Sequence, residues 1–420
     1  MSDLRDTQAH LISLPSGAAA LLIVLLLLLW NTGRSGIGSL LAAYAAKTNH
    51  IAAGNSAVRL SPGDADAHYV RGTLLEGIRD LPGAIDEYHK AATARPEDYF
   101  LWLQLARARE LNGEIDAAIA MARHAVSLAP HYAQPHYQLG NILLRAGRQD
   151  EAFKELKLAG ASNPTLMPGI IDLAWRLSGG NIQFVEKAIA PENPQAYQTL
   201  GQYFRQRNEV DAAIAMYNAT GPAGEQDRHN YLAELIAAKR FKQAGILRAA
   251  DGQSAATSEV IFDPGFEQES NLKEAGFGWR IGDRDQGFQL SLDATSPREG
   301  RSSLKVEFTG DFHPSSTVIY QLVLVEPTTH YQLRVSIRAE GVVSGGLPVV
   351  EIVDADENQI LGQSEQFPNS TSGWGEYTIN FNSKSSTSAV RIGLRRQPCE
   401  GTPCPIFGRL WLDNFSLRRL

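Results

Sequence analysis

The chain has 420 residues, 43% of them hydrophobic and 20% charged, which is the composition of a folded protein and not of a disordered chain. This length exceeds one ordinary core, so we expect two or three domains. The formal net charge is −7, and residues 255–420 carry 15 Lys/Arg against 21 Asp/Glu, a balance of −6. Nucleic acid and anionic membrane surfaces require concentrated positive charge, so this balance argues against both as partners.

An apolar run near the N-terminus predicts a membrane anchor. Residues 18–30 are all apolar, and with the residues before them they make a segment of about 20 residues, enough to cross the hydrocarbon core as a helix. We expect a short N-terminal tail at 1–10 and an uncleaved transmembrane anchor at 11–31, with Trp30 at the interface. A cleaved signal peptide is the alternative. The basic residues that flank the run are balanced, so charge alone does not orient it.

The most informative pattern is a helix that recurs every 34 residues. "AIDEYHKAATARP" at 84–96 returns as "AIAMARHAVSLAP" at 118–130 and as "AFKELKLAGASNP" at 152–164. Each copy ends in proline, which cannot continue a helix, and Gly113 and Gly147 permit a turn between two helices. Small residues also recur in register at Gly72, Ala106, Gly140, Ala84, Ala118 and Ala152. This register predicts stacked helical hairpins, each of which buries its apolar side against the next.

The interval and these positions resemble the tetratricopeptide repeat. The resemblance implies an all-α solenoid of about five or six units over residues 48–250, with a break in phase after Pro164. In this family the first helix of each unit lines a concave surface that binds an extended peptide or a helix, so the resemblance implies a protein partner. The residues at those positions are Tyr69, Phe100, Leu103, Arg107, Tyr137, Asn141 and Gln202. The alternative is that several of them pack between units.

The sequence changes character after residue 250. Residues 251–258 are small and polar, as in a linker, and residues 259–420 contain runs such as "SLKVEFTG" and "HYQLRVSIRA" in which apolar and polar residues alternate. Alternation with many Val, Ile, Tyr and Phe residues predicts about eight or nine antiparallel strands in a β-sandwich. The expected fold class is therefore multidomain: one transmembrane helix, an all-α tetratricopeptide solenoid and an all-β sandwich.

The order of motifs in the second part resembles the jelly-roll carbohydrate-binding modules with a galactose-binding-like fold. The motifs are "FDPGFEQ", "REGRSSLKVEF" and the closing "LWLDNFSL". The resemblance implies a structural calcium ion held by Glu267 and Asp413, with carbonyl groups near Gly300 and Ser302, because this hard cation prefers oxygen ligands. The alternative is that these are turn or edge residues without a metal.

The same resemblance implies that exposed aromatic rings bind a glycan. Core packing is the competing role for every ring, because large rings are mostly buried. The candidates for glycan binding are Phe288, Phe312, Tyr320 and Trp411, whereas Trp279, Trp374 and Tyr331 match family positions in the core. Trp411 is a candidate because it alternates with its leucine neighbours and so points to the opposite face.

Two cysteines, Cys399 and Cys404, lie close together in "CEGTPC". They can form a small disulfide loop if the domain is exported to an oxidising compartment, and two free thiols are the alternative. The sequence has no second pair of ligands at a matching spacing, so a zinc site is not expected.

Catalysis is not expected. The sequence has no phosphate-binding glycine loop, no HExxH and no GxSxG, and Asp354 and Asp356 are ordinary turn residues rather than a glycosidase pair. The interpretation is a non-enzymatic adaptor, anchored in the bacterial inner membrane with its domains on the extracytoplasmic side. It would recruit proteins and bind glycan in exopolysaccharide or envelope polysaccharide assembly or export. The alternatives are a protein–protein scaffold without sugar binding and an accessory subunit of a polysaccharide-acting enzyme.

Overall fold

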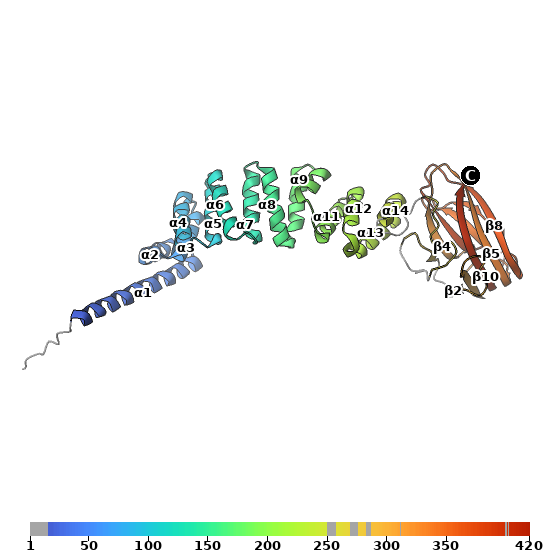
Figure 1. The fold of residues 1–420 in the computed structure, drawn as a ribbon, viewed down its shortest axis with the longest axis horizontal. Coiled ribbons are helices and arrows are strands. Elements are labelled where there is room, and N and C mark those ends of the chain that lie inside the picture. Colours follow the sequence, from blue (N-terminus) through green and yellow to red (C-terminus); the bar gives the residue numbers. More distant parts are fainter. Residues whose placement is uncertain are drawn as a thin grey trace, which may run out of the picture. The chain divides into compact units, whose positions relative to one another are not determined.

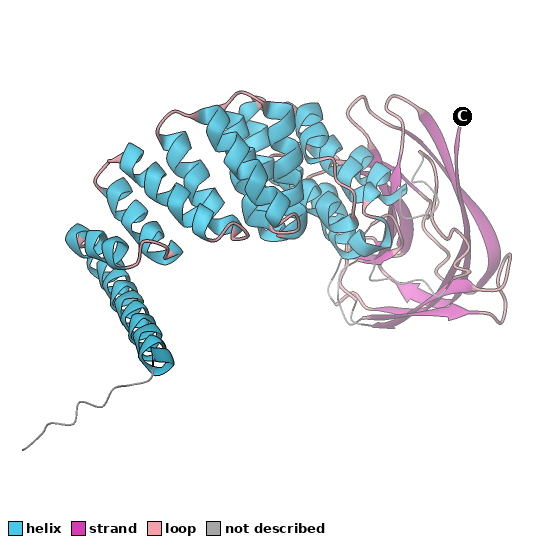
Figure 2. Cartoon of the chain, turned by 60° about the vertical axis from the view of Figure 1, so that its left-hand side comes forward, coloured by secondary structure: helices cyan, strands magenta, loops and turns pink. Residues whose placement is uncertain are grey.

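The computed structural model describes residues 16–249, 258–268, 276–282, 287–310, 312–399, 401 and 403–420. The predicted N-terminal tail, the first residues of the predicted anchor and nearly all of the predicted linker lie outside these described residues. The chain divides into two compact units, Met1–Ala190 and Pro191–Leu420. In the described part of the first unit all regular structure is helical, whereas the second unit contains helices followed by strands (Figures 1 and 2).

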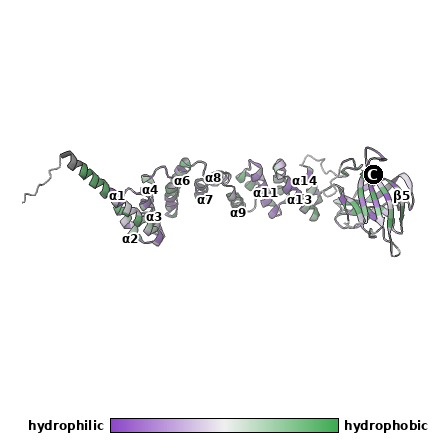
Figure 3. Cartoon of the chain, turned by 90° about the horizontal axis from the view of Figure 1, so that it is seen from below, coloured by the Kyte–Doolittle hydropathy of each residue, from purple (hydrophilic) through white to green (hydrophobic). Residues whose placement is uncertain are grey.

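The first helix, α1 (Ser16–Thr48), is apolar in its first half, as its green colour in Figure 3 shows. By length and composition, Leu21–Thr48 is the one candidate membrane span among the described residues, and a signal sequence would pass the same test. The helix does not end at residue 31, where the sequence predicted the end of the anchor. It continues into the hairpin stack, where Ala42 and Ala45 are buried against the following helices, so the stack begins before residue 48.

Helical hairpins with a 34-residue period follow, as predicted. The pairs α1–α2, α3–α4, α5–α6 and α7–α8 each pack together, and each of the later pairs contacts the one before it. The helices are α2 (Ile51–Leu60), α3 (Ala65–Gly77), α4 (Leu81–Ala94), α5 (Tyr99–Leu111), α6 (Ile115–Leu128), α7 (Ala133–Arg145) and α8 (Gln149–Ser162). Three equivalent helices begin at residues 65, 99 and 133, which are 34 residues apart.

Local chemistry sets the ends of these helices. The side chains of Asp64 and Asp98 accept the backbone N–H groups that α3 and α5 leave unpaired at their first turns. At the turns between helices, Gly113 and Gly147 have φ values of 84° and 75°, a region that glycine enters without steric cost. The predicted role of these two glycines is confirmed.

Glycine also allows the paired helices to approach each other closely. A Cβ atom on Gly140 would lie 2.7 Å from the Leu156 Cγ atom of α8, and one on Gly72 would lie 2.9 Å from the Tyr88 ring of α4. Neither neighbour can retreat, because both side chains are fully buried. The small residues predicted from the repeat are therefore contact points between helices.

The repeat loses its phase after α8, as the sequence indicated. A short 3-10 helix, η1 (Pro164–Leu166), leads into α9 (Met167–Leu177) and α10 (Ile182–Ile189). Helix α10 has 8 residues, whereas α4, α6 and α8 have 14 each. It ends at Ala190 in a left-handed conformation with a φ of 41°. This last hairpin of the first unit is therefore shorter than the others.

The second unit opens with two more helix pairs. Gly201 of α11 lies against Tyr217 of α12, which repeats the glycine–tyrosine contact of α3 and α4. The helices are α11 (Pro194–Gln206), α12 (Val210–Ala219), the short η2 (Gly221–Gly224), α13 (Glu225–Ala237) and α14 (Phe241–Ala249).

Ten described strands form two five-stranded antiparallel sheets, one or two strands more than predicted. One sheet has the order β1-β4-β9-β6-β7 and the other β2-β3-β10-β5-β8. The strands are β1 (Arg280–Ile281), β2 (Phe288–Asp293), β3 (Ser303–Gly310), β4 (Thr317–Leu324), β5 (His330–Ser344), β6 (Pro348–Asp354), β7 (Ile360–Gln363), β8 (Ser372–Asn382), β9 (Ala389–Arg396) and β10 (Ile406–Arg419). We call the first the β4 sheet and the second the β10 sheet; that they form a jelly roll stays a prediction.

Both sheets contribute to one buried core, so the predicted sandwich arrangement is confirmed. Ile319 and Ile392 from the β4 sheet share this core with Leu333 and Leu410 from the β10 sheet. Trp279 and Tyr331 are core residues, as expected from the resemblance. Trp374 is not: its ring is only half-buried, and its indole N–H donates to the Ser296 carbonyl at 3.2 Å.

Candidate functional site

Most of the residues predicted to bind a partner lie on α3, α5 and α7, the first helix of successive hairpins. The rings of Tyr69 and Phe100 meet edge to face with centroids 5.5 Å apart, and Tyr137 is exposed. Leu103 is fully buried inside the stack, so its predicted contact with a partner is wrong. Gln202 is exposed but belongs to the second unit. We call the remaining set, Tyr69, Phe100, Arg107, Tyr137 and Asn141, the A-helix face.

Ion pairs between hairpins neutralise part of this face. Arg107 donates two hydrogen bonds to the carboxylate of Glu76 in the preceding hairpin, at 2.6 and 2.8 Å. One repeat later, Glu110 pairs with the Nε atom of Arg145, which lies four residues beyond the position equivalent to Arg107. Partly exposed pairs contribute at most about 1 kcal/mol each, but they fix the arginine side chains in place. The A-helix face is therefore aromatic and polar, with its arginines already engaged.

A second repeated feature was missed in the sequence. Three ring side chains, 34 residues apart, each place a ring nitrogen on the carbonyl of the proline six residues earlier. The distances are 3.0 Å for His68, 2.8 Å for Trp102 and 2.9 Å for His136. The bond ties the start of each hairpin to the end of the helix before it. The spacing of these rings was the signal that could have revealed it.

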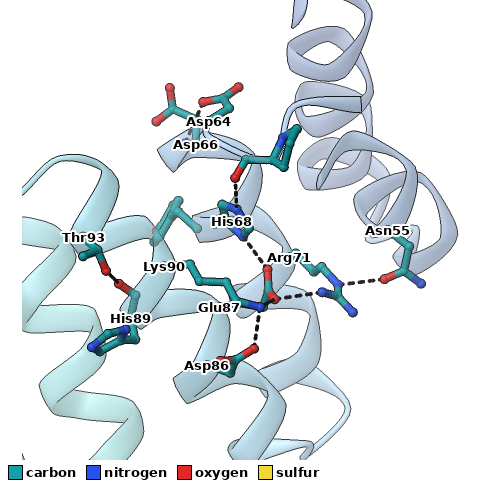
Figure 4. A network of polar contacts seen from close by, with 12 residues as sticks. Asn55, Asp64, Asp66, His68, Arg71, Asp86, Glu87, His89, Lys90 and Thr93 are labelled. Atoms are coloured by element: carbon teal, nitrogen blue, oxygen red, sulfur yellow. Dashed lines mark hydrogen bonds and ion pairs between the residues drawn. The ribbon is translucent and has the colours of Figure 1, made fainter. Parts of the chain in front are cut away.

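His68 takes part in a buried network of charges (Figure 4). Its Nδ1 atom lies 2.7 Å from Glu87 Oε2 and its Nε2 atom lies 3.0 Å from the Pro62 carbonyl oxygen, so both ring nitrogens face acceptors. The hydrogen bond to Glu87 raises the pKa of His68 against the opposing effect of burial. Burial alone would raise the pKa of Glu87, but hydrogen bonds from His68 and Lys90 and the charge of Arg71 lower it.

The β-sandwich has a cavity of about 490 Å³ on the outer face of the β4 sheet, which we call the sheet-face cavity. Gly393 of β9 lies between Tyr320 of β4 and Glu351 of β6 in the strand register, where a Cβ atom would lie only 2.8 Å from Tyr320 Cβ. Arg395 donates to Glu351 at 2.9 Å and Arg391 donates to an asparagine at 2.7 Å. One aromatic ring with fixed polar groups is a combination that suits a sugar.

Three of the four rings proposed for glycan binding do not lie in this cavity. Phe312 is 1% exposed and Trp411 is 4% exposed, so neither can stack on a sugar. The Trp411 ring points away from the core as predicted, but the Arg338 guanidinium covers it at 4.4 Å and its indole N–H donates to Asp293. Phe288 is half-buried and packs against the core. Only Tyr320 of the predicted set lines the sheet-face cavity.

The residues predicted to hold calcium do come together. Glu267 accepts the Arg301 N–H on both oxygens at 2.9 and 3.0 Å, and buried Asp413 accepts the N–H groups of Arg298 and Glu299. The Ser302 hydroxyl donates to a backbone carbonyl, and Gly300 leaves room for the Glu267 carboxylate. Burial raises the pKa of Asp413, and the charge of Glu267 adds to this effect.

These carboxylates fit a calcium ion in chemistry, since calcium prefers oxygen ligands, but not in number, and Asp413 Oδ2 already accepts two N–H groups. Among the described residues no group of three or more Asp, Glu, His or Cys is placed to hold a metal. A calcium site at Glu267 and Asp413 therefore stays a prediction, and it has a simple test. Calcium added after chelation should raise the melting temperature by roughly 5 °C at about a hundred times its Kd, and Glu267→Gln should abolish the shift. An unchanged melting temperature in the unsubstituted protein would rule the site out.

The two cysteines form the predicted disulfide. Arg396, which is fully buried, lies beside it and places its Nη2 atom 3.0 Å from Cys404 Sγ and 2.5 Å from the Cys404 carbonyl oxygen. The guanidinium also donates to the Phe312 carbonyl and to the Ser344 hydroxyl. Burial lowers the pKa of Arg396. The loop that carries the disulfide is therefore fastened to the sandwich by one buried cation.

With this geometry in view, the chain was compared with known families. Residues 103–164 match the tetratricopeptide repeat model. The matched segment runs from α5 to the end of α8, the two hairpins in which the tetratricopeptide register is clearest. Members of this repeat class mediate protein–protein interactions, and neither the match nor the described geometry adds a sign of catalysis.

The curated relatives share only a short segment. DnaJ homolog subfamily C member 3 from Mus musculus and from Homo sapiens is 26% identical over 102 residues. This segment is 24% of the present chain and 20% of each relative, so the chain spans about a fifth of their length.

Similar solved structures are tetratricopeptide-like over less than half of the chain. "Crystal structure of MamA" is 19% identical and covers 43% of this chain and 90% of its own, with a TM-score of 0.27. A Pseudomonas aeruginosa PilF structure is 16% identical and covers 44% of this chain and 88% of its own, with a TM-score of 0.32. YrrB, described as "a TPR protein with an unusual peptide-binding site", is 19% identical and covers 44% of this chain and 82% of its own, with a TM-score of 0.29.

Proposed function

We propose that this protein is a non-enzymatic, membrane-anchored adaptor whose helical repeats bind a protein partner and whose β-sandwich binds a glycan. The proposal places it in exopolysaccharide or cell-envelope polysaccharide assembly or export. The observation that carries it is the A-helix face, to which three successive hairpins each contribute one aromatic residue, Tyr69, Phe100 and Tyr137. Aromatic rings on the same helix of stacked hairpins suit an extended peptide or an amphipathic helix.

Site-specific cross-linking tests the protein half of the proposal. A photo-reactive phenylalanine in place of Tyr137 should capture a defined protein in cells. The same probe in place of Ile78, which is exposed at the end of α3, should capture little of that protein. Equal capture from both positions would contradict specific binding at the A-helix face.

The sheet-face cavity supports the glycan half. Tyr320→Ala should lower the affinity for a bound oligosaccharide by about tenfold or more, because stacking on one ring contributes roughly 1–2 kcal/mol. The control is Phe407→Ala, which removes an exposed ring from β10, outside the cavity. A glycan array probed with the full chain supplies the ligand. Binding that survives Tyr320→Ala unchanged would contradict this site.

A protein–protein scaffold without sugar binding is the second candidate. It is favoured by one observation: three of the four rings proposed for glycan are covered or packed. This candidate would be favoured if the sandwich bound no oligosaccharide on the array but formed cross-links to other proteins.

The location in the bacterial inner membrane, with both domains on the extracytoplasmic side, is part of the same proposal. It is supported by the apolar helix α1 and by the Cys399–Cys404 bond, since disulfides persist in oxidising compartments. Protease added to spheroplasts should digest the sandwich, and resistance there would contradict this orientation.

A further inference from the structure

A second candidate docking site lies between α8 and α10, each of which is the second helix of its hairpin. A cavity of about 400 Å³ opens there, and it is lined by side chains from these two helices and by Ala190. It exists because α10 has 8 residues and ends in a left-handed turn, so it covers only part of the 14-residue helix α8. The break in the repeat therefore leaves a hollow between these two helices.

The floor of this cavity is aromatic. Phe153 of α8 is 5% exposed, and Phe184 of α10 is half-buried; their rings meet edge to face with centroids 5.6 Å apart. The small side chain of Ala188 beside them leaves space above the rings. Such a floor favours one large apolar or aromatic side chain of a ligand.

The rim of the cavity is positively charged. Lys154, Lys157 and Lys187 line it together with a single carboxylate, Asp150, in a chain whose net charge is −7. The Asp150–Lys187 pair is 3.6 Å long and both side chains are mostly exposed, so it is weak.

The other carboxylates of α8 are engaged elsewhere. Glu151 accepts hydrogen bonds from Arg148 at 2.8 Å, and Glu155 lies 2.6 Å from His136. They add no negative charge to the rim, where Lys154 and Lys187 stand against the single carboxylate Asp150.

We propose that this cavity, the α8–α10 groove, binds an acidic peptide segment of a partner protein. One aromatic or large aliphatic side chain of the peptide inserts beside Phe153 and Phe184, and its carboxylates pair with Lys154 and Lys187. The charge of the rim selects the acidic residues and the floor selects the apolar one. Three lysines around one pocket are too few to follow a nucleic acid backbone. The site is separate from the A-helix face, so the partner bound there is a second one.

The test uses the full chain in detergent micelles and a fluorescein-labelled peptide in which glutamates flank one phenylalanine. Fluorescence anisotropy should show saturable binding that weakens as salt is added. Lys154→Glu combined with Lys187→Glu should lower the affinity by about tenfold or more. Lys242→Glu, which reverses an exposed charge on α14, should leave the affinity unchanged. Peptides with glutamine for glutamate, or alanine for phenylalanine, should each bind about tenfold more weakly.

The peptide substitutions are measured on the unsubstituted chain, so they test the groove even if the double lysine variant misfolds. Equal binding by the glutamate and glutamine peptides would overturn the proposal. It would also be overturned if Tyr137→Ala on the A-helix face abolished binding while the double lysine variant bound normally. Displacement of the peptide by phosphatidylglycerol vesicles, with loss of vesicle binding in the double lysine variant, would assign the groove to lipid and refute the peptide.

Discussion

Replacing Arg396 by methionine is expected to lower the free energy of unfolding of the β-sandwich by about 3–5 kcal/mol. The substitution keeps most of the side-chain volume but removes every donor. The Phe312 carbonyl group would then be buried without this partner, and the half-buried Cys404 carbonyl group would lose its donor. Each buried polar group that loses its hydrogen bond costs about 1–3 kcal/mol, so the losses accumulate.

Arg391→Met on the same strand is the matched control. Its guanidinium lies in the open sheet-face cavity and donates to Asn358, so its removal should cost less than about 1 kcal/mol. Urea unfolding followed by hydrogen exchange in β4, β6 and β9 assigns the loss to the sandwich. Similar losses for the two variants would show that the buried cation has no special role.

The second large effect on stability is expected from a substitution of Glu87. Glu87→Ala should lower the stability of the first unit by about 3 kcal/mol, because it leaves Arg71 without its carboxylate and the buried Nδ1 atom of His68 without its hydrogen-bond partner. Glu155→Ala removes the same kind of partner from His136, but Glu155 is 24% exposed whereas Glu87 is 2% exposed. Water can replace the more exposed carboxylate, so Glu155→Ala should cost clearly less. Thermal unfolding of the two variants makes the comparison, and equal costs would contradict it.

The same network predicts a pH dependence of stability. The pKa of His68 is raised in the folded protein, so its contribution is fully present below the unfolded pKa of about 6.5. It is lost as the pH rises through the higher folded value. Stability of the first unit should therefore fall as the pH increases through this window. In Glu87→Ala this part of the pH dependence should disappear, and its persistence would assign the effect to another group.

The order of hairpins could be predicted from the sequence because the relevant interactions are local. Each helix in the stack packs mainly on its nearest neighbours, so one set of small residues, prolines and turn glycines recurs at a fixed interval. Gly113, Gly147 and Gly140 could be assigned roles for this reason. The starts of α3, α5 and α7 at residues 65, 99 and 133 follow the predicted register.

The sites were harder to predict because they depend on contacts between residues far apart in the chain. Alternation along β10 showed that Trp411 faces away from the core, but it could not show that Arg338 of β5 covers the ring. Leu103 has the right spacing for the A-helix face and is nevertheless buried. The break in phase after Pro164 was visible, whereas the groove that it leaves beside Phe153 was not.

The unbroken course of α1 has a mechanical consequence. Arg34 donates to the Arg59 carbonyl at 2.9 Å, and a side chain on Gly38 would collide with Ser61, so the second half of α1 is locked to the end of α2. In the proposed membrane protein one continuous helix joins the span to the first hairpin, without a flexible linker. Tilting or rotating the span would therefore tilt or rotate the hairpin as well. Inserting a single alanine between the apolar half and Arg34 would turn the hairpin by about 100° about the helix axis and re-aim the A-helix face relative to the bilayer.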